Sequence, residues 1–380
     1  MLIDIQLYEL YGLYKLNELK RILNFILILL NIIAVVAMIL SAFSPFSNPQ
    51  NHWIPAMFGL AFPYIFISNI IFLIYWILRQ NKFYLVSLIA LIIGANNLNS
   101  FVQFNLEEKV NTKLPKIVSF NIKAFNLIIW NKDVGQKNTV YDYLEKENAD
   151  IICIQEFFNS KKKRLNITTS DTLMSRTMTK FCHEKYTYSI HKKFFFGMAT
   201  FSKFPIINQG EINFSNTNNL CIYSDIKIEN DTIRVYNCHL QSVHFDKNDY
   251  ILFDSIENLK SEKIDRAKGV LSKLKTAFEI RATQIEVLTK HIEKSPYKVM
   301  LCGDLNDNPV SYSYKNLTSN LNDAFAESGM GIGATHNGNI PFLRIDYILH
   351  SSDIITSGFK IDRSINASDH YPVSCYFNIK

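Results

Sequence analysis

Residues 301–309 read LCGDLNDNP: two acids and two amides gather within five residues, directly after an apolar run, and a proline follows. The letters that lead into this stretch, YKVMLCG, indicate a short buried strand, and the polar cluster lies at its carboxyl end. Proteins of the α/β class build their sites at such strand ends. A plain turn is the alternative, because Asp, Asn and Pro are common turn residues. This stretch alone leaves both interpretations open.

Apolar runs that end in polar residues recur along the chain. They are KIVSFN up to Asn121, DIICIQE up to Glu156, IRVYNCH up to His239, KVMLCGDLN up to Asn306, RIDYILHS from Arg344 and YPVSCYFNI near the end. Helical patterns separate some of them, at residues 139–147 and 262–294. Strands mixed with helices in this way predict an α/β domain.

The first 104 residues have a different composition, with five Lys or Arg and three acids. Residues 22–43 and 54–78 carry no charge, and each stretch exceeds the ~20 residues that cross a bilayer. Residues 83–104 are also uncharged but contain three asparagines. We predict two membrane spans and, at this last stretch, a third. A cleaved signal peptide is the alternative for the first stretch, but the stretch is too long and no small-x-small cleavage pattern follows it.

The basic residues of this region predict its orientation. Three precede the first apolar stretch and two lie between the second and third, whereas residues 44–53 contain none. Positive-inside bias then places the N-terminus in the cytoplasm. With three spans, residues 105–380 lie on the extracytoplasmic side of a multi-pass inner-membrane protein, and with two spans they lie inside. We expect the outer location.

The cysteines bear on two questions: whether the chain has a zinc site, and on which side of the membrane residues 105–380 lie. The six of them show no CxxC spacing, which disfavours a zinc site. Cys153, Cys238 and Cys302 fall in apolar strand-like runs, where a free thiol packs as a small hydrophobic group. Because exported domains more often pair or avoid cysteines, this pattern counts against the outer location.

Two further patterns concern the region after residue 104. Its net charge is +4, which is too mild to argue for a nucleic-acid partner. Arg281 shares one face of the predicted long helix with apolar residues on either side. A buried arginine needs a carboxylate or carbonyl partner, or its head extends to the edge of the core, and both readings remain open.

The strand ends together supply polar residues that suit one kind of site: Asn121, Glu156, His239, Asp304, Asn306, Asp346, Asp369 and His370. Carboxylates with an amide suit Mg²⁺ or Mn²⁺. Histidines can donate to phosphoryl oxygens, and an Asp can orient one of them. Taken singly, each residue is more often structural. As a set they indicate metal-assisted hydrolysis of a phosphate ester.

The order of these motifs resembles that of the endonuclease/exonuclease/phosphatase superfamily, which includes DNase I, sphingomyelinases and inositol polyphosphate phosphatases. The matching stretches are SFNIKAFN, IICIQE, GMATFSKFPI, YNCHLQS, LCGDLNDNP, RIDYIL and SDHYPV. The resemblance covers residues 115–380 and implies a DNase I-like, four-layer α/β/β/α sandwich with two mixed β-sheets. We therefore expect a helical membrane region at 1–104 and a catalytic domain at 105–380.

The resemblance also implies roles for the site residues. Glu156 becomes the principal ligand of Mg²⁺ or Mn²⁺, with Asn121 and Asp369 beside it. The other five residues act on water and phosphate. Asp304 orients or deprotonates the attacking water, Asn306 holds that water or a phosphoryl oxygen, His370 donates to the phosphoryl oxygen with its ring fixed by Asp346, and His239 is a second donor.

The expected function is that of a membrane-anchored, metal-dependent phosphodiesterase or phosphatase. A lipid head group or another small phosphodiester is favoured over nucleic acid, because the anchor holds the site near a bilayer. His239 separates the chain from apurinic endonucleases, which lack this histidine. A membrane-bound nuclease is the alternative. A catalytically silent binding domain is a further one, against which the intact polar set argues. The bilayer is the expected partner of the N-terminal helices, and no protein partner is predicted.

Overall fold

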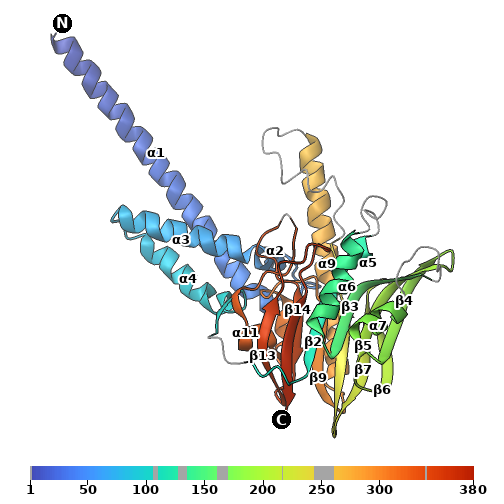
Figure 1. The fold of residues 1–380 in the computed structure, drawn as a ribbon. Coiled ribbons are helices and arrows are strands. Elements are labelled where there is room, and N and C mark those ends of the chain that lie inside the picture. Colours follow the sequence, from blue (N-terminus) through green and yellow to red (C-terminus); the bar gives the residue numbers. More distant parts are fainter. Residues whose placement is uncertain are drawn as a thin grey trace.

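The structure is a computed structural model of the chain, and it describes residues 2–105, 110–126, 135–160, 170–215, 217–243, 261–338 and 340–380. Figure 1 shows an N-terminal arm of helices attached to a body that is built on two β-sheets. The body carries the strands that the sequence predicts to end in polar residues, and the arm carries the uncharged stretches.

The first sheet has six strands in the order β13-β14-β2-β3-β5-β4. Their bounds are β2 Lys116–Asn121, β3 Ile151–Ser160, β4 Phe181–Ile190, β5 Phe194–Ser202, β13 Ile354–Ile361 and β14 Val373–Ile379. β2 and β3 are parallel, and the other pairs are antiparallel. The sheet is therefore mixed, as expected.

The second sheet also has six strands, in the order β10-β12-β9-β8-β7-β6. Their bounds are β6 Ile206–Asn213, β7 Leu220–Ile228, β8 Asp231–His239, β9 Lys298–Asp304, β10 Asn322–Asp323 and β12 Asp346–His350. Only β8 and β9 are parallel within it. A separate pair, β1 (Val102–Phe104) and β11 (Met330–Ile332), joins the end of the arm to the body.

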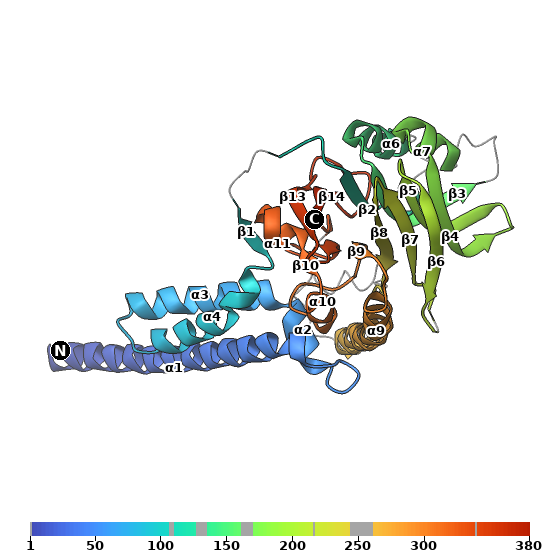
Figure 2. The same cartoon turned by 90° about the horizontal axis from the view of Figure 1, so that it is seen from below.

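The side chains that each strand buries on its two faces show how the sheets and helices are layered. Ile151 and Cys153 of β3 point into the core between the sheets, whereas Ile152 and Ile154 point outward under α6 and α7. Both faces of β3 are covered, so its sequence is a continuous apolar run rather than an alternating one. Helices α9 and α10 cover the outer face of the second sheet. The result is the four-layer sandwich that the motifs predict (Figures 1 and 2).

The helices of the body have the following bounds: α5 Lys123–Asn126, α6 Gly135–Glu147, α7 Ser170–Thr177, α9 Ser261–Ile292, α10 Tyr312–Leu317 and α11 Ala324–Ser328. Those of the arm are α1 Leu2–Phe43, the 3-10 turn η1 Ser44–Phe46, α2 Ile54–Leu60, α3 Phe62–Leu78 and α4 Tyr84–Leu98. α1, α3 and α4 lie side by side in both cartoon views, while α2 lies against the body.

The second predicted span, residues 54–78, is not one straight helix. It breaks at Ala61 into α2 and α3, which meet at 70°. Pro63, at the second position of α3, explains the break, because proline lacks an amide proton and disfavours a helical conformation just before it. The uncharged stretch is thereby reduced to the 17 residues of α3.

Among the described residues, one helix, Tyr11–Phe46, is long and apolar enough to cross a membrane. α2 and α3 meet that standard only as a bent pair, and α4 is shorter, with 15 residues. A signal sequence near the N-terminus would also be long and apolar enough to meet this standard. The N-terminal region thus contains at least one helix suited to a membrane.

The cysteine prediction was wrong for one residue. Cys238 on β8 stands opposite Cys221 on β7, and the two form a disulfide. Adjacent antiparallel strands bring their side chains together on one face, which the spacing of 17 residues in sequence does not reveal. Cys153 and Cys302 are free and buried in the core, as predicted.

Candidate active site

The predicted site residues meet at one edge of the sandwich. Asn121 ends β2, His239 ends β8 and Asp304 ends β9. In the parallel pair β8–β9, His239 stands directly opposite Asp304. Because both sheets present the carboxyl ends of their parallel strands at this rim, polar side chains from distant parts of the chain converge there.

Gly303 explains why Asp304 can stand so close to β8. Its φ of 151° is one that residues with a side chain rarely adopt. A Cβ atom at this position would lie 2.0 Å from the carbonyl oxygen of Cys238. The glycine of the GD motif is therefore required for the close approach of the two strands.

Asp304 is the centre of the site. Its Oδ2 accepts a hydrogen bond from Nδ2 of Asn121 at 3.0 Å and lies 3.7 Å from Nε2 of His239 and 3.6 Å from Nε2 of His370. Its Oδ1 accepts the backbone N–H of Asn306 at 2.8 Å. The carboxylate is buried, and the groups around it come from both sheets.

Glu156 reaches the same centre through an irregularity of β3. The register of β3 with β5 shifts between Ile154 and Phe157, and Glu156 between them has a φ of 47°. Bulges of this kind re-aim a side chain, and a left-handed glutamate is strained, which is a common feature of functional sites. Its Oε1 accepts from Nδ2 of Asn121 at 3.1 Å and lies 3.8 Å from Nε2 of His239. Unlike Asp304, the glutamate is partly exposed.

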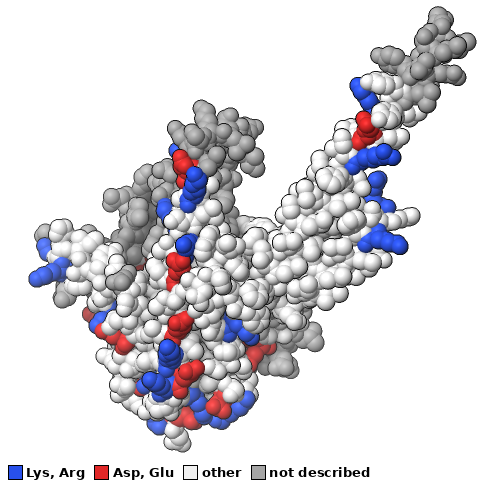
Figure 3. Space-filling view, turned by 180° about the vertical axis from the view of Figure 1, so that it is seen from behind, with Lys and Arg blue, Asp and Glu red and all other residues white. Residues whose placement is uncertain are grey.

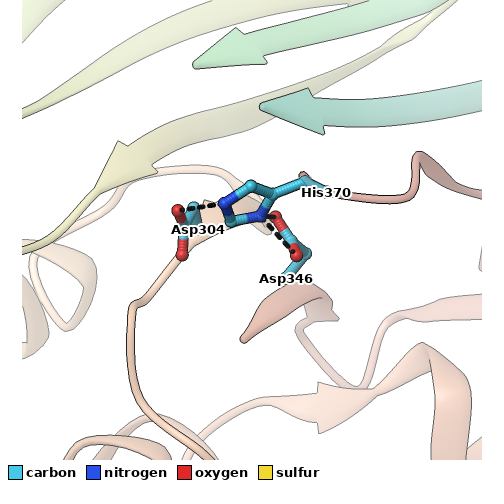
Figure 4. Close-up of side chains that lie close together, drawn as sticks. All are labelled: Asp304, Asp346 and His370. Carbon is cyan, nitrogen blue, oxygen red and sulfur yellow. Dashed lines mark hydrogen bonds and ion pairs between the residues drawn. The ribbon is translucent and has the colours of Figure 1, made fainter. Parts of the chain in front are cut away.

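Asp346 and His370 form a buried pair beside Asp304 (Figure 4). Nδ1 of His370 lies 3.0 Å and 3.1 Å from the two carboxylate oxygens of Asp346, while Nε2 faces Asp304. The aspartate begins β12 and stands opposite Asp304 of β9 in the register of the second sheet. The imidazole is thus oriented by one carboxylate and aimed at another.

The charge state of His370 follows from this placement. Burial lowers its pKa, but Asp346 and Asp304 outweigh burial and raise the pKa to about 10. Burial also raises the pKa of Asp304, with His370 and His239 acting against it. Asp304, Asp346 and His370 are close enough to hold a metal on geometry alone. A protonated imidazole has no lone pair for a metal, however, so His370 is suited to donate a proton and not to bind a metal ion.

Of the groups suited to a divalent cation, Glu156 is partly exposed at the rim and Asn121 is buried beside it. Glu156 and Asn121 offer oxygen ligands, and four carboxylates, those of Glu156, Asp304, Asp346 and Asp369, occur in this small region. Oxygen-only donors and an excess of negative charge are what Mg²⁺ and Mn²⁺ prefer. The residues present therefore fit the expected cation.

Asp369 has a partner that the sequence analysis did not foresee. Its Oδ2 forms an ion pair with Nζ of Lys123 at 2.5 Å, and Ser368 donates to its Oδ1 at 3.4 Å. Ser368 also donates to the backbone oxygen of Asn121 at 2.8 Å, which holds this segment against the end of β2. Asp369 therefore lies at the same rim, but no described contact joins its carboxylate to Glu156.

His336 is a second residue that the sequence analysis missed. It forms an isolated β-bridge with His370, and the two rings meet edge to face with centroids 5.5 Å apart. Its position 34 residues before His370, in the loop GIGATHNGN, offers no spacing signal. A histidine in a loop with three glycines was the only available clue.

The structure also gives the contacts of Asn306 and Arg281, two further residues that the sequence analysis singled out. Asn306, with a φ of 51°, donates from Nδ2 to the backbone oxygen of Leu240 at 2.9 Å. Of the two alternatives for Arg281, the structure shows the buried one with a carboxylate partner. Its Nε lies 3.3 Å from Oδ2 of Asp307. Its Nη1 donates to the backbone oxygen of Gln241 at 2.7 Å. The arginine thus braces the segments that follow Asp304 and His239.

A family model described as the endonuclease/exonuclease/phosphatase family matches residues 118–370. The chain belongs to this family. Its members hydrolyse phosphoesters and generally use divalent metal ions, so the protein is a phosphoester hydrolase by family. A second model, described as a domain of unknown function, matches residues 24–101. No curated protein matches the chain.

Several solved structures are similar to this chain, and each of the following covers 70% of it. The human Nocturnin catalytic domain with bound sulfate is 20% identical over 70% of this chain and 94% of that chain, with a TM-score of 0.49. A humanized D. rerio TDP2 is 14% identical over 70% and 100%, with a TM-score of 0.49. The Bacteroides thetaiotaomicron mannosyl-6-phosphatase is 14% identical over 70% and 100%, with a TM-score of 0.48.

Proposed function

We propose that this protein is a membrane-anchored phosphodiesterase or phosphatase that depends on Mg²⁺ or Mn²⁺. The observation that carries the proposal is the convergence of Asn121, His239 and His370 on one carboxylate oxygen of Asp304, with Glu156 joined through Asn121. An acid surrounded by donors, next to a partly exposed second acid, suits the hydrolysis of a phosphoester.

Each side chain has a role that its contacts support. Asp304 orients the attacking water and accepts its proton, and Asn306 holds the water or a phosphoryl oxygen. His370, kept protonated by Asp346, donates from Nε2 to the charge that develops on phosphate, and His239 donates from the other side.

Glu156 is the principal residue that would hold the cation, with Asn121 and Asp369 beside it. Bound there, Mg²⁺ or Mn²⁺ supplies a Lewis acid that polarises the phosphoryl group. Burial raises the pKa of Asp369, but the nearby His370 and the ion pair with Lys123 outweigh burial, so the pKa is lowered. The chain thus presents deprotonated oxygens at the position where a cation is needed.

We further propose that residues 1–104 form a membrane region of three spans and residues 105–380 the catalytic domain. The arm has the reversed pattern of a membrane bundle, since its outward side chains are apolar: Phe25 of α1, Ile71 of α3 and Ile92 of α4 are 68%, 61% and 65% exposed. Three polar side chains of the helices, Asn31, Asn69 and Ser87, are buried inside. Among these, Asn31 donates to Ser87 at 2.8 Å and accepts from Trp76 at 3.0 Å.

The sidedness proposal rests on where the charges lie. Figure 3 shows charged side chains toward the far end of the arm and an uncharged surface between them and the body. Lys15, Lys20 and Arg21 lie in the N-terminal half of α1, and Arg79 and Lys82 lie in the turn between α3 and α4. Both groups are on the part of the arm that points away from the body. Positive-inside bias puts this end in the cytoplasm and the catalytic domain outside. The Cys221–Cys238 disulfide supports an oxidising compartment.

The favoured substrates are lipid head groups and other small phosphodiesters, because the arm holds the rim next to a bilayer. The test is hydrolysis by the full-length protein in lipid nanodiscs with Mg²⁺, against sphingomyelin, phosphatidylinositol phosphates, a bis-nitrophenyl phosphate ester, DNA and RNA. Turnover of the lipid or the small ester that disappears in Glu156→Gln supports the proposal. Cleavage of nucleic acid alone identifies a nuclease, and no turnover of any substrate contradicts an enzymatic function.

The metal is tested in the same assay. EDTA is expected to abolish turnover, and Mg²⁺ or Mn²⁺ to restore it, because the ligands are carboxylate and amide oxygens. Full recovery with Zn²⁺ alone would show that the assigned cation is wrong.

A further inference from the structure

The loop that follows Asp304 joins the catalytic rim to the membrane region. Its first half is held by the body: Leu305 N–H donates to the oxygen of Ile345 at 2.9 Å, and the Asn306 side chain donates to the oxygen of Leu240 at 2.9 Å. These bonds hold the start of the loop from the two strands that flank β9, β12 on one side and β8 on the other. The second half of the loop, residues 307–310, turns away from the rim toward the arm.

That second half ends on α2. Asn308 is buried, and its Nδ2 donates to the backbone oxygens of Gly59 at 2.8 Å and Leu60 at 3.3 Å. The last carbonyl groups of a helix have no partner within the helix. The break between α2 and α3 exposes such carbonyls, and one amide from the catalytic loop binds two of them. The Oδ1 of Asn308 in turn accepts the N–H of Val310 at 3.0 Å, which fixes the amide in this orientation.

Val310 continues the contact into the helical bundle. It is buried in one hydrophobic cluster with Met38 of α1, Phe62 of α3 and Ala90 of α4, so this loop residue packs into the cluster where the three helices meet. A Cβ atom at Gly59 would lie 2.3 Å from the backbone oxygen of Val310 and 2.3 Å from Oγ of Ser44. The backbone of α2 and the backbone of the loop therefore touch where only glycine fits.

Two further contacts tie the arm to segments that carry site residues. Arg344, two residues before Asp346, is buried, donates to the oxygen of Ser100 at 2.8 Å and pairs with both oxygens of Asp323 at 2.7 Å. Tyr64 of α3 donates to the oxygen of Pro341 at 2.9 Å. The arm thus contacts the loops before Asp346 and after Asp304, which are the two acids that flank His370.

We propose that the C-terminal end of α2 is a positioning element of the active site: the carbonyls of Gly59 and Leu60, through Asn308, hold the loop that places Asp304 and Asn306. This proposal rests on the proposed function, because it requires Asp304 and Asn306 to act in hydrolysis. The membrane region then does more than anchor the enzyme, since a change at the α2–α3 break alters turnover of a substrate that never touches the bilayer.

The test uses the full-length protein in detergent and the soluble bis-nitrophenyl ester. Gly59→Ala forces the loop away from α2, and Asn308→Asp removes both donations while it keeps the acceptor for Val310. A displacement of about 1 Å in a catalytic group lowers turnover by about 10²-fold, so we expect a fall in kcat of that size in both variants, with KM within about two-fold of wild type.

Each variant has a matched control. Gly12→Ala makes the same change in α1 at a position with open space around it. Asn316→Asp removes an amide donation to a backbone oxygen, that of Tyr312 at 2.8 Å, within α10. Both controls are expected to keep wild-type kcat. Near-UV circular dichroism identifies a variant that has lost its fold, and Asn308→Asp then decides the result if Gly59→Ala does not fold.

The outcomes separate the two proposals. An inactive wild-type protein contradicts the proposed function itself. An active wild-type protein, with folded Gly59→Ala or Asn308→Asp whose kcat equals that of its control, contradicts the positioning role and leaves the proposed function in place. A rise in KM with unchanged kcat also overturns it, because it indicates a change in substrate binding and not in the placement of Asp304.

Discussion

Asp304 is a buried carboxylate whose ionisation state depends on opposing effects of burial and of its neighbours. It is buried, its pKa is raised by that burial, and His370 and His239 lower the pKa again from two sides. An isolated buried carboxylate would be neutral at physiological pH. The donors from Asn121 and from the N–H of Asn306 favour the ionised form that a base or water-orienting group requires.

At this scale we expect Asp304→Asn, Glu156→Gln and His370→Ala to lower kcat by about 10²–10⁴-fold each, because each removes an interaction made with the transition state. Steady-state kinetics of the full-length protein checks this, with melting temperatures as the test of folding. Asp353→Asn, which changes an exposed acid outside the site, serves as the control. Near-wild-type turnover in any of the three variants shows that the role assigned to that residue is wrong.

His183 gives a pH dependence of stability that is separate from catalysis. It is buried on β4 with Nδ1 3.0 Å from Oγ of Ser224, and burial lowers its pKa from 6.5 to about 4, although Glu211 opposes the shift. The unfolded chain therefore binds more protons than the folded one between these values. The stabilising contribution is present above pH 6.5 and is lost as the pH falls toward 4.

We expect the melting temperature of wild type to fall between pH 7 and pH 5 more steeply than that of His183→Gln, with a free-energy difference of about 1 kcal/mol per pH unit at most. Thermal unfolding at several pH values measures it. His191→Gln, an exposed histidine at the turn between β4 and β5, keeps the wild-type slope. Parallel curves for His183→Gln and wild type would contradict the assignment.

Among the elements, the three helices of the arm are joined by polar contacts within an apolar bundle. The side chain of Asn31 is fully buried and bonds both to Ser87 of α4 and to Trp76 of α3. In the absence of water, such a contact holds neighbouring helices together. α4, which is short for a span, is thus tied to the two longer helices beside it.

Asn31→Ala is expected to destabilise the bundle by about 1–2 kcal/mol, because it leaves two buried polar groups without their partner. The measurement is the midpoint of unfolding of the full-length protein in increasing denaturing detergent. Asn96→Ala, an exposed asparagine of α4, is the control and should leave the midpoint unchanged. A midpoint for Asn31→Ala equal to that of Asn96→Ala would show that these bonds do not hold the helices together.

For the whole molecule, the main question is on which side of the membrane the catalytic domain lies. With three spans the catalytic domain lies outside, where Cys221 and Cys238 are oxidised while Cys153, Cys182, Cys302 and Cys375 remain thiols. Reporter fusions after Lys109, with alkaline phosphatase and with a fluorescent protein that matures only in the cytoplasm, are expected to give phosphatase activity and no fluorescence.

Thiol labelling of the denatured, unreduced protein gives an independent measurement, and it should modify four of the six cysteines. Fluorescence without phosphatase activity would place the domain inside, reduce the spans to two and shift the expected substrates to cytoplasmic nucleotides and inner-leaflet lipids. Labelling of all six cysteines would show that the Cys221–Cys238 disulfide is absent, and this too would favour a cytoplasmic location of the domain.

Sequence alone predicted most of the fold, and several of the residues that it proposed for the site lie close together in the structure. Short apolar runs with polar ends are local signals, so the positions of β2, β3, β8, β9 and β14 could be predicted from composition and spacing. Because the carboxyl ends of parallel strands share an edge, Asn121, His239 and Asp304 could be expected to meet. Pro63 was a local signal as well, and it would have predicted the break between α2 and α3.

Tertiary structure decided the contacts between residues that are distant in the chain and carry no common spacing. Lys123 reaches Asp369, and His336 reaches His370, because β2 and the C-terminal loops meet at the rim. Asn308 binds the end of α2 across 249 residues. No periodicity encodes such a pair, since each partner looks like an ordinary turn or helix-end residue in its own segment. Only the packing of the arm against α9 and against the loop after Asp304 brings Asn308 within hydrogen-bonding distance of α2.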